Sequence, residues 1–104
     1  MTNPVESFFP VHPGAVVKDE IEARGISQKQ LATLMEVPYT MLNEMLNGKR
    51  SISTEMALLF EAALDINAEM LIDLQSRYSI RVARSSKRLT ARFVRIRKAC
   101  AAAL

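Results

Sequence analysis

Residues 27–53 read SQKQLATLMEVPYTMLNEMLNGKRSIS, and this stretch decides the fold of the chain. Its first part has the features of a short amphipathic helix. Ser27 is a good N-terminal cap, and Gln30, three places later, can complete a capping box with it. Apolar residues then recur at helical spacing, at Leu31, Leu34 and Met35. Because Ala32 is small enough to let a crossing helix approach closely, we predict a helix from Ser27 to Met35 with a second helix packed across it.

The second part of the stretch supplies that crossing helix. Glu36, Val37 and Pro38 form the connecting turn, because Pro38 biases Val37 toward an extended conformation and suits the first turn of a new helix. The new helix covers residues 39–46 and ends at Asn47-Gly48. Its inward-facing residues are Leu42, Met45 and Leu46. Two short helices joined by a tight turn make a helix-turn-helix, which favours double-stranded DNA as the partner.

Polar side chains remain on the outer face of the second helix, near its start, where such motifs contact base edges. They are Tyr39, Thr40, Asn43 and Glu44. An asparagine amide can read adenine, a glutamate can accept from cytosine, and tyrosine or threonine can reach a base or a phosphate. Lys49 and Arg50 follow the helix and are expected to meet backbone phosphates. The plainer interpretation is that Tyr39 covers the turn and that Glu44, if it misses its base, repels phosphates.

Three further helices complete the expected all-α domain. The first covers residues 13–24 and ends at Gly25. Ser53 caps a fourth helix, and Asn67 caps a fifth that reaches about Tyr78. Their inward-facing apolar residues are Val17 and Ile21, then Met56, Leu59, Phe60 and Leu64, then Met70, Leu71, Leu74 and Tyr78. The expected organisation is therefore an arm over residues 1–12, a five-helix domain over 13–78 and an extension over 79–104.

The net charge of +3 hides a sharp division of charge along the chain. Residues 1–76 carry five basic and eleven acidic side chains, a net charge of −6, whereas residues 77–104 carry nine basic side chains and no acidic one. Such a tail suits a polyanion or an acidic protein surface. We predict a partly helical extension that adds non-specific DNA affinity. The alternatives are that Val82, Leu89, Phe93 and Ile96 dock it on a protein surface, or that it has no binding role.

Five stretches of the chain carry a resemblance to a known family: HPG (12–14), IEARGISQKQLA (21–32), MLNGKRSIS (45–53), EMALLFEAAL (55–64) and LIDLQSRY (71–78). Their order and spacing resemble the HigA-type antitoxins of bacterial toxin–antitoxin modules, a branch of the Xre-like helix-turn-helix proteins. Three positions depart from the family pattern. Ala15 stands where an acidic residue usually follows HPG, Glu36 where glycine usually makes the turn, and Pro38 where serine usually caps the recognition helix.

The resemblance implies a phage-repressor-like fold and a set of partners. It implies operator DNA, with Gln28 binding a phosphate, and a small HigB-type RNase toxin. It also implies a homodimer that pairs its recognition helices through the fifth helix, where Met70, Leu71 and Leu74 offer apolar surface. The residues alone leave two other readings open. One is a protein-interaction module that has lost operator binding, and the other is an orphan transcriptional regulator without a toxin.

Few residues suggest any other chemistry. His12 is the only histidine and Cys100 the only cysteine, and their separation offers no metal-ligand spacing, so we expect neither a metal nor a cofactor. A cap or turn role suits His12, at a helix start. No catalytic constellation stands out, and an enzyme is not expected. With no long apolar run and no signal-peptide pattern at the start, we expect a cytoplasmic protein and no membrane partner.

Overall fold

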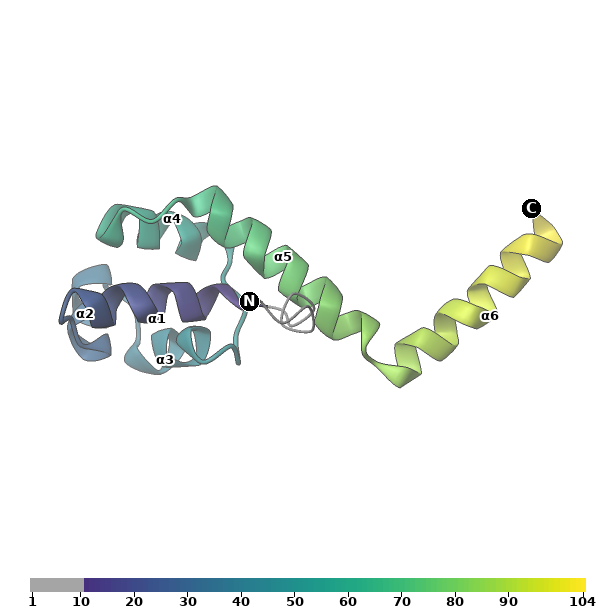
Figure 1. Cartoon of the computed structure of the whole chain (residues 1–104), viewed down its shortest axis with the longest axis horizontal. Coiled ribbons are helices and arrows are strands. Elements are labelled where there is room, and N and C mark those ends of the chain that lie inside the picture. The colour runs from purple at the N-terminus through teal and green to yellow at the C-terminus, as the bar shows by residue number, and fades with distance from the viewer. Residues whose placement is uncertain (1–10) are drawn as a thin grey trace, which may run out of the picture.

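The computed structural model describes residues 11–104, and within that range the chain forms six helices and no strand (Figure 1). The helices are α1 (Pro13–Ala23), α2 (Gln28–Met35), α3 (Tyr39–Leu46), α4 (Thr54–Leu64), α5 (Ala68–Arg84) and α6 (Lys87–Ala103). The all-α prediction is confirmed, and the number of five helices is wrong because the extension forms a sixth. Most of the predicted arm, residues 1–10, lies outside the described residues. None of the six helices is long and apolar enough to cross a membrane.

The predicted caps begin the helices where they were expected. The hydroxyl of Ser27 accepts from the backbone N–H of Gln30 at 3.0 Å, and the Gln30 side chain accepts from the Ser27 backbone at 3.1 Å, so the capping box is formed. Ser53 and Asn67 cap α4 and α5 in the same way. Each cap satisfies a backbone donor that the helix itself leaves without a partner. Local hydrogen bonding therefore fixes where α2, α4 and α5 begin.

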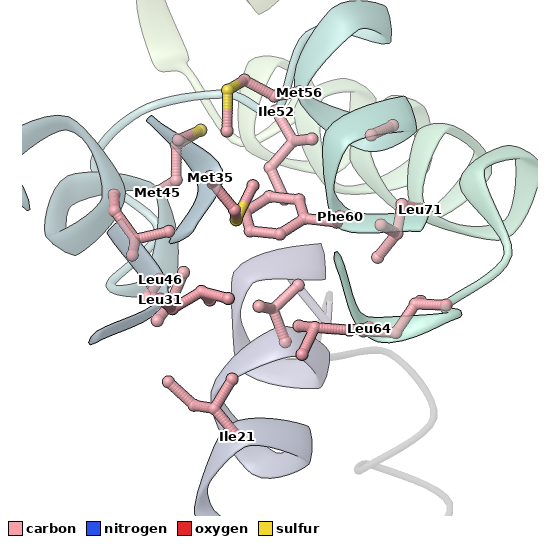
Figure 2. Close-up of a cluster of buried hydrophobic side chains, with 14 of the residues drawn as sticks. Ile21, Leu31, Met35, Met45, Leu46, Ile52, Met56, Phe60, Leu64 and Leu71 are labelled. Carbon is pink, nitrogen blue, oxygen red and sulfur yellow. The ribbon is translucent and has the colours of Figure 1, made fainter. Parts of the chain in front are cut away.

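The core gathers residues from α1 to α5 around Phe60, as Figure 2 shows. Among its fully buried members are Val17, Ile21, Leu31, Leu42, Met45, Leu46, Phe60, Leu64 and Leu71. The prediction for Leu34 was wrong, because its side chain is 73% exposed. The inward face of α2 consists of Leu31, Ala32 and Met35, which share one side of the helix, and Leu34 projects beyond the edge of that face.

Gly14 sets how closely α1 packs on the C-terminal end of α3. A Cβ at this position would overlap the backbone carbonyl oxygen of Met45 and press on the Cα of Leu46. Only hydrogen fits there. The helix that carries the outer polar residues is therefore held against α1 by direct backbone contact, and its position depends on this glycine.

Two non-glycine residues adopt the left-handed conformation at helix ends. Glu36 ends α2 with a φ of 58°, and Asp65 ends α4 with a φ of 58°. A side chain in this region costs about 1–2 kcal/mol relative to glycine. The departure at Glu36 thus strains the turn without displacing it, because the backbone N–H of Val37 still bonds to the carbonyl of Ala32 at 3.0 Å.

The fifth helix runs beyond the predicted end at Tyr78, to Arg84, and a separate helix follows. Ser85 and Ser86 mark the break between the two helices. The hydroxyl of Ser86 caps α6 by accepting from the N–H of Leu89 at 3.3 Å. The residues after it are mostly strong helix formers, which explains why the extension is helical apart from this break and its last residue. No residue of α6 is buried, and the helix leaves α5 at a steep angle to form an open V (Figure 1).

Candidate nucleic-acid interface

The residues predicted to contact DNA gather on one outer surface of α2 and α3. Tyr39 and Thr40, in the first turn of α3, are exposed, and Asn43 and Glu44, one turn later, are half-buried. Lys49 and Arg50 are exposed just beyond the end of α3. The predicted inward residues of α3 are all buried, so the two faces of the helix separate as expected. This surface presents hydroxyl, amide, carboxylate and cationic groups within one short segment.

A hydrogen bond joins the first helix of the motif to the second. Nδ2 of Asn43 donates to Oε1 of Gln28 at 2.8 Å, and Oδ1 of Asn43 accepts from Nδ2 of Asn47 at 3.2 Å. An asparagine amide has two N–H donors and two acceptor lone pairs, so one of each is used and one of each is left. A bidentate contact with adenine requires one donor and one acceptor, and the amide of Asn43 has one of each still available. The bond to Gln28 also holds the amide plane in place.

Glu44 and Arg50 form an ion pair across the end of α3. Nη2 of Arg50 lies 3.1 Å from Oε1 of Glu44, and Nε of Arg50 donates to the same oxygen at 3.3 Å. The pair offsets the negative charge that would otherwise face phosphates. Both side chains are more than a third exposed, and such surface pairs contribute only about 0–1 kcal/mol. The guanidinium can therefore exchange the carboxylate for a phosphate at little cost.

Lys29 is a functional candidate that the sequence analysis missed. Its Nζ lies 5.8 Å from the ring centroid of Tyr39, within the range of a cation–π contact between α2 and α3. Lys29 follows Gln28 in the first turn of α2, and this position is the sequence signal that could have identified it as a DNA-contact candidate. The contact itself could not be read from the sequence, because it joins residues on either side of the turn. It adds a cation to the surface of the candidate interface.

His12 and the predicted dimer residues lie elsewhere. His12 occupies the N-cap position of α1, but its side chain makes no capping hydrogen bond. The ring packs edge-on against Tyr78, with 5.7 Å between centroids.

The predicted dimer residues lie on α5, where Met70 is 39% exposed and Leu74 is half-buried. Leu71 is fully buried in the monomer and offers no surface to a partner. Of the three predicted dimer residues, only Met70 and Leu74 therefore remain candidates.

Comparison with known proteins places this arrangement in a family. Residues 17–71 match the family model described as Helix-turn-helix. The chain is 33% identical to the Pseudomonas aeruginosa antitoxin HigA, whose structure was solved with the higBA promoter; the match covers 72% of this chain and 83% of that one, with a TM-score of 0.68. This chain belongs to the helix-turn-helix family, in its HigA-type branch.

Other members extend the likeness. A HigA-family addiction module antidote protein from Coxiella burnetii is 29% identical over 86% of this chain and 92% of its own, with a TM-score of 0.66. Virulence-associated protein A′ of Dichelobacter nodosus is 35% identical over 72 residues, which are 68% of this chain and 63% of that protein. The chain therefore matches somewhat less than two-thirds of the length of this relative.

The departures from the HigA-type pattern leave the recognition helix in place. Pro38 occupies the N-cap position of α3 with extended backbone angles and makes no side-chain capping bond, yet α3 begins at the next residue. Proline holds φ near the value that the helix start requires, which replaces part of what a capping hydroxyl supplies. Ala15 lies half-buried in α1. The family geometry is retained with different local chemistry at the turn.

Proposed function

We propose that this chain is a DNA-binding antitoxin that represses its own operon as a dimer and neutralises a HigB-type RNase toxin. The observation that carries the DNA-binding part is the Gln28–Asn43 hydrogen bond, which fixes a polar reading surface across the two helices of the motif. The likeness to an antitoxin solved with its promoter supports the same conclusion. The toxin-binding part rests on membership of the HigA-type branch.

On this proposal α3 enters the major groove with its N-terminal end leading. Tyr39, Thr40, Asn43 and Glu44 then face base edges, while Gln28, Lys49 and Arg50 face the phosphates on either side. Contacts to phosphates fix the position of the protein on the duplex, and contacts to base edges select the sequence. Lys29 adds a further phosphate contact beside Gln28.

The test is a gel-shift series on the DNA upstream of the gene. The double substitution Tyr39→Ala/Thr40→Ala should weaken binding by about 1–3 kcal/mol for each base interaction that it removes, with helical content unchanged. Ala62→Ser/Ala63→Ser, at exposed positions of α4, is the matched control and should bind as the natural chain does. Equal affinity and sequence preference in the double variant would remove α3 from the readout and favour the protein-interaction reading.

The dimer part of the proposal follows from the geometry of operators. Paired half-sites lie about 34–36 Å apart, one turn of DNA, so two recognition helices must be held together. We place the contact on α5, where Met70 and Leu74 offer apolar surface. Leu74→Glu should then give monomers in light scattering. A folded dimer of this variant would move the interface to another surface.

The toxin part is tested by expression in cells. Expression of the small basic protein encoded beside this gene should arrest growth, and co-expression of this chain should restore it. The Tyr39→Ala/Thr40→Ala variant should restore growth equally well, because it alters only the DNA surface. Absence of a growth-arresting neighbour would leave an orphan regulator.

A further inference from the structure

Helix α6 has an apolar face that the monomer covers only in part, since Leu89 and Phe93 are half-buried. Leu89, Phe93 and Ile96 follow one another at spacings of four and three residues, which places them on one side of the helix. No residue of α6 is buried, and Ile96 is 48% exposed. The six cations of α6 occupy the other sides. A helix with a separate apolar stripe usually packs that stripe against another element.

This face borders the inside of the V between α5 and α6. An open hollow of about 650 Å³ lies there, with Ile80 and Ala83 of α5 on one wall and Phe93 and Ile96 of α6 on the other. Ile80 is itself 50% exposed. The hollow is mostly apolar, and Arg84 and Arg97 also line it.

A second hollow of complementary character lies between α4 and α5. It has a volume of about 370 Å³ and is lined by Leu58 and Ile72 among others. Leu58 is 54% exposed, so this apolar floor is open to solvent. Three carboxylates line the same hollow: Glu61, Glu69 and Asp73. We call it the acidic groove. It has the shape and the charge that an apolar helix face with arginines on either side requires.

Both hollows open on one side of α5. Glu69, Ile72, Asp73, Ile80 and Ala83 recur at spacings of three, four and seven or eight residues, which keeps them on a single face of the helix. From Ile72 to Ile80 the helix advances about 12 Å. In Figure 1 the V opens toward the side on which α4 lies. Because α6 diverges from α5, it is held away from the acidic groove of its own chain.

We propose that the apolar face of α6 docks in the acidic groove of a second copy of this chain, and that the second copy returns the same contact. Two α5 helices laid antiparallel, with these faces together, bring each α6 to the groove of the other protomer. Such a contact is self-complementary about a twofold axis. The inference rests on the proposed dimer, and it places the contact on these two surfaces instead of on Met70 and Leu74.

Charge favours a second copy as the occupant. Arg92 and Arg97 flank the apolar stripe of α6 on its two sides, and Glu69 and Asp73 line the groove, all four of them exposed. Complementary charges across an interface fix its register and disfavour other arrangements. Both halves of the contact lie on one chain, so every copy carries a donor helix and an acceptor groove. Met70 and Leu74 lie on a different side of α5 and present a smaller apolar surface.

The test reverses the charges of each half separately. Glu69→Arg/Asp73→Arg alters the groove, and Arg92→Glu/Arg97→Glu alters α6. Each variant alone should dimerise about tenfold or more weakly than the natural chain in sedimentation velocity, because like charges then meet. An equimolar mixture of the two variants should recover dimerisation, since both contacts of the mixed dimer again pair opposite charges. Failure of the mixture to recover would overturn the proposal.

The matched control is Lys87→Glu/Lys98→Glu, which makes the same change of charge on the side of α6 opposite the apolar stripe. It should dimerise as the natural chain does. If all three charge variants dimerise normally and only Leu74→Glu gives monomers, the interface is the other face of α5 and the proposal fails while the dimer stands. If the natural chain binds its operator as a monomer, the proposed dimer itself fails.

Cys100 allows a second measurement without any substitution. This lone exposed thiol lies eleven residues after Leu89 and therefore on the same face of α6. A benzophenone attached to Cys100 should cross-link to peptides of α4 or α5 on illumination. In a mixture of ¹⁴N- and ¹⁵N-labelled protein these cross-links should join chains of different label. Cross-links confined to a single chain would show α6 closing on its own body and would overturn the proposal.

Discussion

Asn43 donates to Gln28 across 2.8 Å, and this one bond ties the side chain of the recognition helix to the first turn of the helix that precedes it. The two residues have different proposed partners, a base for Asn43 and a phosphate for Gln28. Because they share a hydrogen bond, a change in either alters the position of the other. Positioning on the backbone and reading of the sequence are therefore coupled at this point of the surface.

A double-mutant cycle should detect that coupling. Gln28→Ala and Asn43→Ala should each weaken operator binding, and the double variant should lose less affinity than the two single variants lose together. Contacting residues of this kind show interaction energies of about 0.5–3 kcal/mol. Affinities measured by fluorescence anisotropy on one operator fragment give the four values. Strict additivity would mean that the two side chains act independently on DNA.

Gly14→Ala should destabilise the fold and displace α3. The new Cβ would meet the backbone of Met45, which cannot rotate away as a side chain can. Overpacking of this kind costs about 1–3 kcal/mol, and contact with backbone places the change at the upper end. The melting temperature and the operator affinity should both fall.

Gly25→Ala provides the comparison for this variant. Gly25 has a φ of +68°, and a Cβ there meets nothing within 4 Å. The substitution should cost only the strain of a left-handed alanine, about 1–2 kcal/mol, and should leave operator affinity of the folded protein unchanged. Equal loss of affinity in both variants would show that general destabilisation explains the effect of Gly14→Ala.

Glu36→Gly should stabilise the protein. Glycine adopts the left-handed conformation of residue 36 without a steric penalty, and part of this gain is offset by the greater freedom of glycine in the unfolded chain. A net gain of about 1 kcal/mol would raise the melting temperature by about 4–8 °C for a domain of this size. Glu36→Ala retains the Cβ and should give little of this increase, so calorimetry of the pair separates strain from the removal of the carboxylate.

The cations on the outer side of α6 should contribute to non-specific DNA affinity. Arg88 and Arg95 are exposed, and no carboxylate neighbours them in the sequence. Each phosphate that is no longer neutralised should flatten the dependence of log affinity on log salt by about 0.9. Arg88→Gln/Arg95→Gln should reduce the slope for random-sequence duplex and change operator preference little. An unchanged slope would remove α6 from the DNA.

The sequence was sufficient for the elements whose signals are local. The caps at Ser27, Ser53 and Asn67 and the stop at Gly25 each depend on a few adjacent residues, and all were predicted correctly. Leu34 was assigned wrongly because its spacing fits an amphipathic helix but its direction depends on where α2 meets the body. The extension was expected to be only partly helical, whereas its helix-forming composition makes almost all of it helical.

The candidate site was less accessible to prediction. The residue types and their order indicated which side chains face outward. Which side chains pair with one another could not be predicted. The Asn43–Gln28 bond and the Lys29–Tyr39 contact depend on how α2 and α3 cross. The Glu44–Arg50 ion pair depends on the path of the chain after α3. Leu71 was expected both in the core and at the dimer surface, and the contacts of α5 with α1 and α4 place it fully in the core.

The ion pair between Glu44 and Arg50 has a consequence for how the protein searches DNA. On a random duplex Glu44 has no base partner, so its carboxylate competes with the phosphates for the guanidinium and weakens the hold of this cation on the backbone. Where a cytosine amine meets Glu44, the carboxylate gains a new partner and Arg50 is released to a phosphate. Correct recognition then adds two interactions at once, and the ratio of specific to non-specific affinity rises more than either interaction alone would raise it.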